Sequence, residues 1–345
     1  MDLDKLAKIL SENNQPKFRL GQIKKAIYQD GVSSFQEITT LSKELREELN
    51  KKIKILSFTP NKILTAKNKQ SVKAALRLED GNIIETVLLS PLPSSWSVCI
   101  STQVGCPLNC AFCATGRGGF KRNLITEEIT DQILFWKQYM KAENEKLKTK
   151  NYISNVVYMG MGELFLNWEN VKQSLKELTD AKLFGFGSRS ISVSTCGIPD
   201  GILKFVQEFP QINLAVSLHF ADDDKRSRYM PINKKYNLEK IKEALQKYFQ
   251  ISNRKVFLEY IMLAGINDNL EDAKKLADYI KSIGKLQLLH VNLIKYNATG
   301  NEFKSSSGNK IQTFKNFLER NRINVTIRKS LGEEIQGACG QLAGK

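Results

Sequence analysis

The sequence predicts an α/β protein built around a partial (β/α)6 TIM-like barrel, with a small helical module before the barrel and an extension after it. Six short apolar runs alternate with amphipathic stretches, and repeated strand-helix units of this kind form parallel sheets. The 345 residues are 41% hydrophobic, which is enough to bury a large core. We therefore divide the chain into residues 1–90, 91–300 and 301–345, with the barrel in the middle.

The first 90 residues are predicted to form a separate module. Apolar residues at helical spacing predict helices over residues 2–12, 19–30 and 42–53, and residues 71–78 and 82–89 alternate as strands do. The chain carries a formal charge of +16, and residues 49–78 contain eight basic residues and no acidic one. Such a segment attracts polyanions, so we expect this module to bind nucleic acid; a solvated surface that serves only solubility is the alternative. The eight are Lys51, Lys52, Lys54, Lys62, Lys67, Lys69, Lys73 and Arg77.

The barrel is predicted from six strands and the helices between them. The strands are Val98–Thr102, Asn155–Met159, Ser190–Ser194, Asn213–Leu218, Val256–Leu263 and Leu288–Ile294. The helices lie at about 126–140, 168–180, 199–208, 238–250 and 268–283, with a lysine-rich loop near 141–150. Barrels of this class carry their chemistry at the carboxyl ends of the strands.

The extension begins with a loop rich in glycine and serine at residues 305–308. A helix near 309–321 and a strand over Asn324–Arg328 are expected to follow, and the last residues are GACGQLAGK.

Three of the six cysteines lie in one loop directly after the first predicted barrel strand. Cys106, Cys110 and Cys113 have C-x3-C-x2-C spacing. Three thiolates can bind three irons of a cubane and leave the fourth iron open for a substrate. Cys196 or Cys339 could instead add a fourth ligand, as in a structural zinc site, so the spacing alone leaves the metal open.

The rest of the composition indicates a cytosolic protein. No apolar run has the length needed to cross a bilayer, and residues 1–10 lack the apolar core of a signal peptide. In a reducing compartment, clustered cysteines serve metal binding or catalysis and not disulfides.

The cysteine loop, together with Ala114–Gly116 and Gly119–Leu124, resembles the radical S-adenosylmethionine (SAM) enzymes. More narrowly, the chain resembles the bacterial methyltransferases that act on C2 of adenine in 23S ribosomal RNA and transfer RNA. Further ordered matches are Ile84–Val87, Cys99, Gly160–Glu163, Ser192–Thr195, Val216–His219, Arg226, Met230–Asn233, Glu259–Leu263, His290–Ile294 and Ala338–Gly344.

The resemblance implies one [4Fe-4S] cluster on Cys106, Cys110 and Cys113, and two SAM molecules per turnover. His219 lies on an apolar strand, so a hydrogen-bonded core histidine is an equally good interpretation. Leu164 stands where the family usually has proline, and we expect a local change of the backbone there. The SAM-binding residues that the family match implies are Gly162, Glu163, Ser194, Ser217, Leu218, His219 and Asn297.

The resemblance also assigns three catalytic residues. Cys339 would accept a methyl group from one SAM as a thiolate and then carry it, as a methylene radical, to the adenine. Cys99 would resolve the protein–RNA adduct through a transient disulfide with Cys339. Glu85 would take the carbon-bound proton. Cys196 and His290 are interpreted as structural.

The partners implied are 23S rRNA and tRNA, with an electron donor such as flavodoxin or ferredoxin, no membrane and a monomeric chain. Two other functions stay open: the related adenine C8 methyltransferase of antibiotic resistance, which shares the cluster loop and both catalytic cysteines, and a non-catalytic, metal-stabilised RNA-binding protein. Possible phosphate contacts, besides the basic segment, are Arg117, Lys121, Arg122, Arg328 and Lys329.

Overall fold

Seven parallel strands form most of a ten-stranded sheet in the computed structural model, which describes residues 1–92 and 94–344. The α/β class is confirmed, and the ends of the six predicted barrel strands differ from the prediction by at most three residues. The strand predicted in the extension pairs parallel with its neighbour and becomes the seventh. In their order across the sheet, these strands are β4 (Ser95–Cys99), β7 (Tyr152–Tyr158), β8 (Ile191–Thr195), β9 (Asn213–Ser217), β10 (Val256–Met262), β11 (Leu289–Lys295) and β12 (Asn324–Arg328).

Three antiparallel strands continue the same sheet beyond β4. They are β1 (Phe58–Thr65), β2 (Ser71–Leu78) and β3 (Ile83–Leu92), and β1 forms the edge. β1 was not predicted, because most of its side chains are exposed and Pro60 interrupts the alternation at a register shift. The sheet runs across position 90 within β3, so the second half of the first module is joined to the barrel. The division into three parts stays a prediction.

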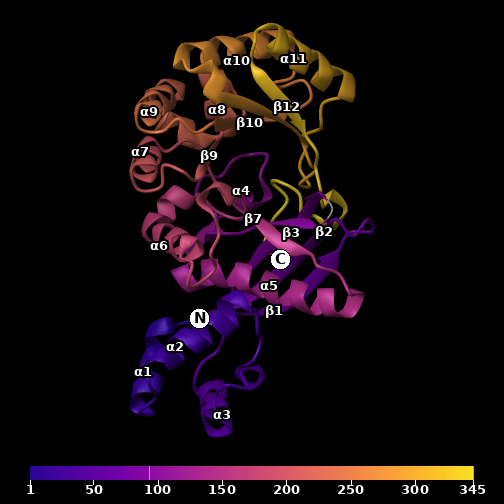
Figure 1. Ribbon diagram of the computed structural model, residues 1–345. Helices are drawn as coiled ribbons and strands as arrows, with labels where there is room; N and C mark the ends of the chain where they lie inside the picture. The colour runs from indigo at the N-terminus through magenta and orange to yellow at the C-terminus, as the bar shows by residue number, and fades with distance from the viewer. Residues whose placement is uncertain (93, 345) are drawn as a thin grey trace.

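Helices form an arc around the parallel strands (Figure 1). The predicted lysine-rich loop is wrong, because α5 continues to Leu147. The segment after Met140 contains Ala, Glu, Lys and Leu without Gly or Pro, and these are good helix formers. The helices of the arc are α5 (Thr126–Leu147), α6 (Trp168–Thr179), α7 (Pro199–Glu208), α9 (Leu238–Ile251), α10 (Leu270–Ile283) and α11 (Gly308–Arg320).

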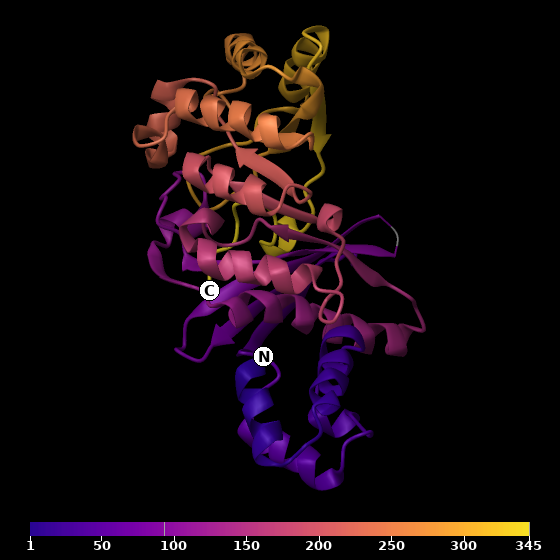
Figure 2. The same cartoon turned by 60° about the vertical axis from the view of Figure 1, so that its left-hand side comes forward.

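The N-terminal helices form a small unit beneath α5 (Figures 1 and 2). Leu6, Ile23 and Leu49 are fully buried inside it. The amide Nε2 of Gln138, on α5, donates to the carbonyl of Val32 at 2.9 Å and ties the unit to the barrel. Its elements are α1 (Leu3–Glu12), α2 (Phe18–Lys24), a π-helical turn (Lys25–Gln29), a 3-10 turn (Phe35–Glu37) and α3 (Lys43–Lys52).

Short elements surround the carboxyl ends of the parallel strands. The hairpin β5 (Gln103–Gly105) and β6 (Phe120–Asn123) brackets the cysteine loop, which ends in the short helix α4 (Ala114–Arg117). The C-terminal end of the chain lies against the early part of the sheet in both views (Figures 1 and 2). No helix within the described residues is long and apolar enough to cross a membrane. The remaining short helices are α8 (Asp223–Tyr229) and 3-10 turns at Leu164–Asn167, Ser188–Ser190, Pro231–Lys234, Leu286–Leu288 and Glu333–Ile335.

Candidate active site

The cysteine loop is held in shape by its own backbone. Gly105 has a φ of +77°, and a Cβ at this position would meet the carbonyl oxygen of Gly119 at 1.9 Å, so only glycine fits. The amide of Cys106 donates to the same carbonyl at 2.8 Å, and the amide of Cys113 donates to the carbonyl of Cys110 at 3.1 Å. The loop therefore presents its three thiols from a fixed turn at the mouth of the barrel.

The environment of these thiols suits a metal cluster. Burial raises the pKa of Cys106 and of Cys113, and their repulsion with Cys196 adds to the shift. Contact with Cys110, followed by burial, raises the pKa of the Cys196 thiol. Iron cations would supply the positive charge that lets such thiols ionise. Among residues 1–92 and 94–344 no group of three His, Cys, Asp or Glu side chains is arranged to hold a single metal ion.

Glu163 follows β7 and reaches across to the turn after β8. Its carboxylate accepts from the amides of Cys196 at 2.7 Å and Phe165 at 3.2 Å, and its own amide donates to Gln103 Oε1 at 2.9 Å. It is 2% exposed, and burial raises the pKa of its carboxyl group. Gly162 before it has a φ of +110°, which favours glycine. The predicted pair thus lies in the wall between the cysteine loop and β8.

The backbone at Leu164 shows no sign of the change expected from the missing proline. Glu163 has φ −104° and ψ 108°, the extended conformation that a residue before proline adopts. Leu164 is the first residue of a 3-10 turn and is 1% exposed. Proline is well tolerated at the first position of a helical turn, so the leucine changes the packed side chain and not the path of the chain.

Polar side chains lie at or just after the carboxyl ends of β8, β9 and β11, and one of them, Asn297, has an unpaired acceptor atom. The hydroxyls of Ser194 and Ser217 lie 3.3 Å apart. Asn297 is 2% exposed, and its Nδ2 donates to the carbonyl of Cys339 at 3.2 Å, while its buried Oδ1 has no hydrogen-bond partner. A buried acceptor without a partner is costly, so Oδ1 is suited to accept an N–H or O–H group of a ligand. This arrangement fits the SAM pocket that the sequence predicts.

His219 has the hydrogen bond and burial of a structural histidine, and its role in the SAM pocket stays a prediction. Its Nδ1 accepts from the amide of Ile261 at 3.2 Å, and its ring meets Phe112 of the cysteine loop edge to face at 5.1 Å. Burial, helped by the charge of Arg226, lowers the pKa of the imidazole to about 3. A neutral ring whose Nδ1 accepts carries its proton on Nε2. His219 is therefore a structural histidine that touches the cluster loop, and Leu218 beside it is fully buried.

The C-terminal segment brings Cys339 to the cysteine loop. The amide of Ala114, directly after Cys113, donates to the carbonyl of Gly340 at 2.8 Å, and the hydroxyl of Thr115 donates to the carbonyl of Leu342 at 2.6 Å. Cys339 itself is exposed. The last turn of the chain is thus fastened to α4, and its thiol is left open at the barrel mouth.

Cys99 and Glu85 approach the same segment from the sheet. Cys99 ends β4; burial and then the nearby Cys339 raise the pKa of its thiol to about 12. Glu85 on β3 is 2% exposed. One of its carboxylate oxygens accepts from Lys73 Nζ at 3.0 Å and the other from the amide of Ala343 at 2.8 Å. The structure therefore brings all three predicted catalytic residues to the C-terminal segment.

Arg328, at the end of β12, has a role that sequence reasoning missed. It was predicted only as a phosphate contact, but its Nη1 lies 3.3 Å from Glu259 Oε2. The charge of Cys339 is the largest cause of a raised pKa of Arg328, and Cys99 contributes to the same shift. The guanidinium therefore has both thiols and Glu259 as its charged or ionisable neighbours.

The fully buried Arg226 ties together the strand ends that carry the site. It donates to the carbonyls of Cys196 at 2.6 Å and Leu218 at 3.1 Å and to Asn233 Oδ1 at 2.7 Å. The ArgxxxMetProIleAsn pattern in the sequence was a signal for this contact, because Asn233 belongs to it. By contrast His290, bonded to Thr326 at 2.8 Å, keeps its structural interpretation.

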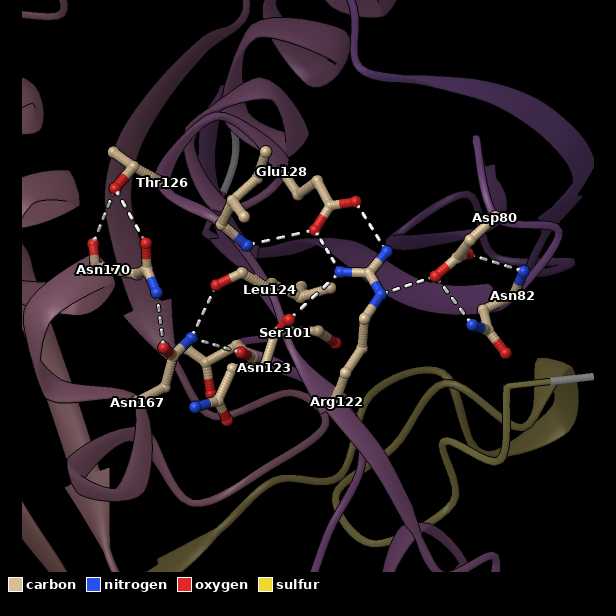
Figure 3. Close-up of polar contacts among 12 residues, drawn as sticks. Asp80, Asn82, Ser101, Arg122, Asn123, Leu124, Thr126, Glu128, Asn167 and Asn170 are labelled. Carbon is tan, nitrogen blue, oxygen red and sulfur yellow. Dashed lines mark hydrogen bonds and ion pairs between the residues drawn. The ribbon is translucent and has the colours of Figure 1, made fainter.

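Besides Arg328, several of the predicted phosphate contacts have partners within the protein. Arg117 donates to the carbonyl of Thr299. Figure 3 shows Arg122 between Glu128 and Asp80, at 2.7 Å and 2.5 Å. Lys73 of the basic segment is buried against Glu85. Arg122 and Lys73 therefore form ion pairs within the protein. Lys121, bonded to Asn82 at 2.8 Å, and Lys329 keep exposed side chains.

Known proteins resemble the chain over its whole length. Residues 100–280 match the Radical SAM superfamily, and residues 1–55 match the ribosomal RNA large subunit methyltransferase N-terminal domain. The crystal structure of a radical SAM methyltransferase from Sphaerobacter thermophilus is 34% identical, with a TM-score of 0.91, over 100% of this chain and 98% of the other. The fold is therefore that of a radical SAM enzyme.

The curated relatives narrow this class. A probable dual-specificity RNA methyltransferase RlmN of Thermotoga sp. (strain RQ2) is 41% identical over 328 residues, which cover 94% of this chain and 91% of the relative. A protein of the same description from Staphylococcus aureus (strain JH9) is 41% identical over 344 residues, with coverage of 99% and 91%. The chain belongs to the RlmN family of radical SAM RNA methyltransferases.

Proposed function

We propose that this protein methylates C2 of adenine in 23S rRNA, in the peptidyl transferase loop, and in the anticodon loop of tRNA, through an S-methylcysteine at Cys339. The observation that carries the proposal is the docking of the Cys339 segment on α4, beside the cysteine loop. A methyl acceptor must lie beside the group that supplies the methyl and the radical, and the contacts of this segment with Ala114 and Thr115 support such a position for Cys339.

The chain holds its cofactors with residues from several strands. Cys106, Cys110 and Cys113 bind one [4Fe-4S] cluster. The cluster and two SAM molecules supply the methyl group and the radical that activates it. Gly162 and Glu163 contact the amino acid part of SAM, and Asn297 offers its free Oδ1 to the cofactor. Ser194, Ser217, Leu218 and His219 complete the pocket.

The catalytic residues act in order on the substrate. Cys339 would take the methyl group as a thiolate. The cofactor-derived radical would then remove a hydrogen atom from the S-methyl group, and the S-methylene carbon would bond to C2 of the adenine. Glu85 would accept the proton that C2 releases, and the unpaired electron would return to the cluster. Cys99 would attack the Cys339 sulfur, the bond from that sulfur to the methylene carbon would break, and the released carbon would take up a proton to become the methyl group.

The substrate base must be unstacked to reach this site, as in an RNA loop. We expect the exposed part of the basic segment to bind the RNA backbone, and an electron donor such as flavodoxin or ferredoxin to reduce the cluster. We further expect the enzyme to act as a monomer in the cytosol, where these RNAs are found.

The product of the reaction tests the proposal. Anaerobically reconstituted protein is incubated with SAM, a reductant and an RNA hairpin, and the digested RNA is analysed by mass spectrometry. We expect 2-methyladenosine with the wild type and none with Cys339→Ala. The finding of 8-methyladenosine would assign the chain to the antibiotic-resistance reaction instead.

The metal content tests the cofactor assignment separately. We expect about four irons per chain and a cluster spectrum that changes when SAM is added. Tetrahedral zinc, without a response to SAM, would support a non-catalytic RNA-binding protein.

A further inference from the structure

A buried lysine connects the proposed base to the segment that carries Cys339. Lys73 lies on β2 and is 7% exposed. Its Nζ donates to Glu85 Oε1 at 3.0 Å and to the carbonyl of Gln336 at 3.2 Å. Glu85 is on the neighbouring strand, whereas Gln336 belongs to the C-terminal segment, 263 residues away in the sequence. One ammonium group therefore holds two parts of the site together.

The carboxylate of Glu85 completes a second link to the same segment. Its Oε2 accepts from the amide of Ala343 at 2.8 Å, so each of its oxygens has a donor. The C-terminal residues also cover this part of the sheet: Leu342 is 5% exposed, and a Cβ on Gly344 would meet the carbonyl oxygen of Ile83 at 2.8 Å. Lys73 and Glu85 thus bind the C-terminal segment before and after Cys339, at Gln336 and at Ala343.

The docked C-terminal segment keeps Glu85 inaccessible to a substrate. The side chain is 2% exposed while the segment is docked, and a base as large as adenine cannot approach an atom that is covered in this way. Glu85 can reach the adenine only when Ala343 has left Oε2. Lys73 would then keep the freed carboxylate in place through Oε1, because its bond to Glu85 does not depend on the C-terminal segment.

We propose that Lys73 is a positioning residue that holds Glu85 and the Cys339 segment in one docked arrangement, and that Glu85 accepts a proton only after Ala343 has left it. Cys339 would thus be methylated with the segment docked, and the proton would be removed with the segment released. This order of events rests on the proposed function of Glu85 and Cys339, whereas the docking itself does not.

Hydrogen exchange of the full chain tests the docking without RNA. Lys73→Met keeps the length of the side chain and removes its charge, and Ala343→Pro removes the donated N–H and leaves Lys73 and Glu85 intact. We expect both variants to speed amide exchange in residues 336–344 by about tenfold, with little change in β2 and β3. Lys247→Met, an exposed lysine on α9, serves as the matched control and should leave the exchange unchanged. Unchanged exchange in Lys73→Met, beside faster exchange in Ala343→Pro, would overturn the role of Lys73.

The two half-reactions test the order of events. We expect Lys73→Met made in cells to contain methylated Cys339, as the wild type does, because an opening that is about tenfold more frequent still leaves the docked form predominant. The variant should form 2-methyladenosine about tenfold more slowly, because Lys73 no longer holds the freed carboxylate of Glu85 in place. Lys73→Arg, which keeps the charge, should recover part of the rate. A proportional loss of methylated Cys339 and of RNA product would refute the positioning role, since a merely distorted site would lose both. If the wild type forms no methyladenosine, the proposed function fails while the exchange experiment still decides on the docking.

Discussion

Replacing Arg226 by methionine removes the charged donor at the centre of the site. The guanidinium is fully buried and donates to the carbonyls of Cys196 and Leu218, to Asn233 Oδ1 at 2.7 Å and to the carbonyl of Tyr236 at 3.4 Å. Burial lowers the pKa of this group, which reflects the cost of removing the charge from water. Methionine fills a similar volume but donates to none of the four acceptors.

The expected loss of stability is the difference between two opposing effects. The carbonyl of Leu218 keeps the amide of Phe220 as a donor at 2.7 Å, so three acceptors lose their donor. Buried acceptors without a partner cost about 1 to 2 kcal/mol each, so three of them cost about 5 kcal/mol. Methionine does not have to be dehydrated, and this returns about 3 kcal/mol, because the effective penalty for a buried ion is several kcal/mol. We therefore expect Arg226→Met to lower the free energy of unfolding by about 2 kcal/mol.

Urea unfolding followed by tryptophan fluorescence measures this loss, with Arg226→Lys as the matched variant. The lysine keeps the charge but has three N–H donors on one atom, so we expect it to recover only part of the stability. A loss below about 1 kcal/mol for Arg226→Met would show that dehydration cancels the hydrogen bonds, and would refute the reasoning. The affinity for SAM should fall as well, because the carbonyls of Cys196 and Leu218 adjoin the pocket.

Three further predictions concern single groups of the site. Arg328→Met should slow the alkylation of Cys339 by iodoacetamide at neutral pH about fivefold or more, because the thiolate loses a nearby cation; an equal rate would show that the guanidinium does not act on this thiol. The pKa of His219 lies at about 3 in the folded chain, below its ordinary value of 6.5, so the unfolded chain binds the proton more readily and stability falls as the pH drops below 6.5. From pH 7.5 to pH 5.5 this group should cost about 1 kcal/mol, measured by urea unfolding as the difference between the wild type and His219→Gln; the same pH dependence in both proteins would contradict the assignment. Leu164→Pro should change the free energy of unfolding by less than about 1 kcal/mol, since the backbone there already suits proline, and a loss of several kcal/mol would show that the leucine side chain decides the packing.

The sequence predicted much of the fold because the relevant signals are local. A strand such as β10 is an apolar run interrupted only by Glu259, and α9 repeats its apolar residues at helical spacing, so each is visible within a short window. The edge strand β1 gave no such signal, because most of its side chains are exposed. The lysine-rich loop predicted after Met140 is wrong, because the good helix formers of this segment continue α5 to Leu147.

The spacing of the three thiols was determined by the sequence alone, since it is fixed within a few residues of chain. The turn at Gly105 was not predicted, because it depends on the carbonyl of Gly119 on the other strand of the hairpin. Only the tertiary structure decided which partners the individual basic side chains have. Lys73 belongs to a basic segment in the sequence, yet it is buried against Glu85, and Arg122 is paired with Glu128 in place of a phosphate. The bond from Ala343 to Glu85 joins residues 258 positions apart, and no periodic pattern encodes such a contact. Long-range pairs of this kind are fixed only when the sheet and the C-terminal segment pack together, because burial removes water as a competing partner and makes each polar group find another.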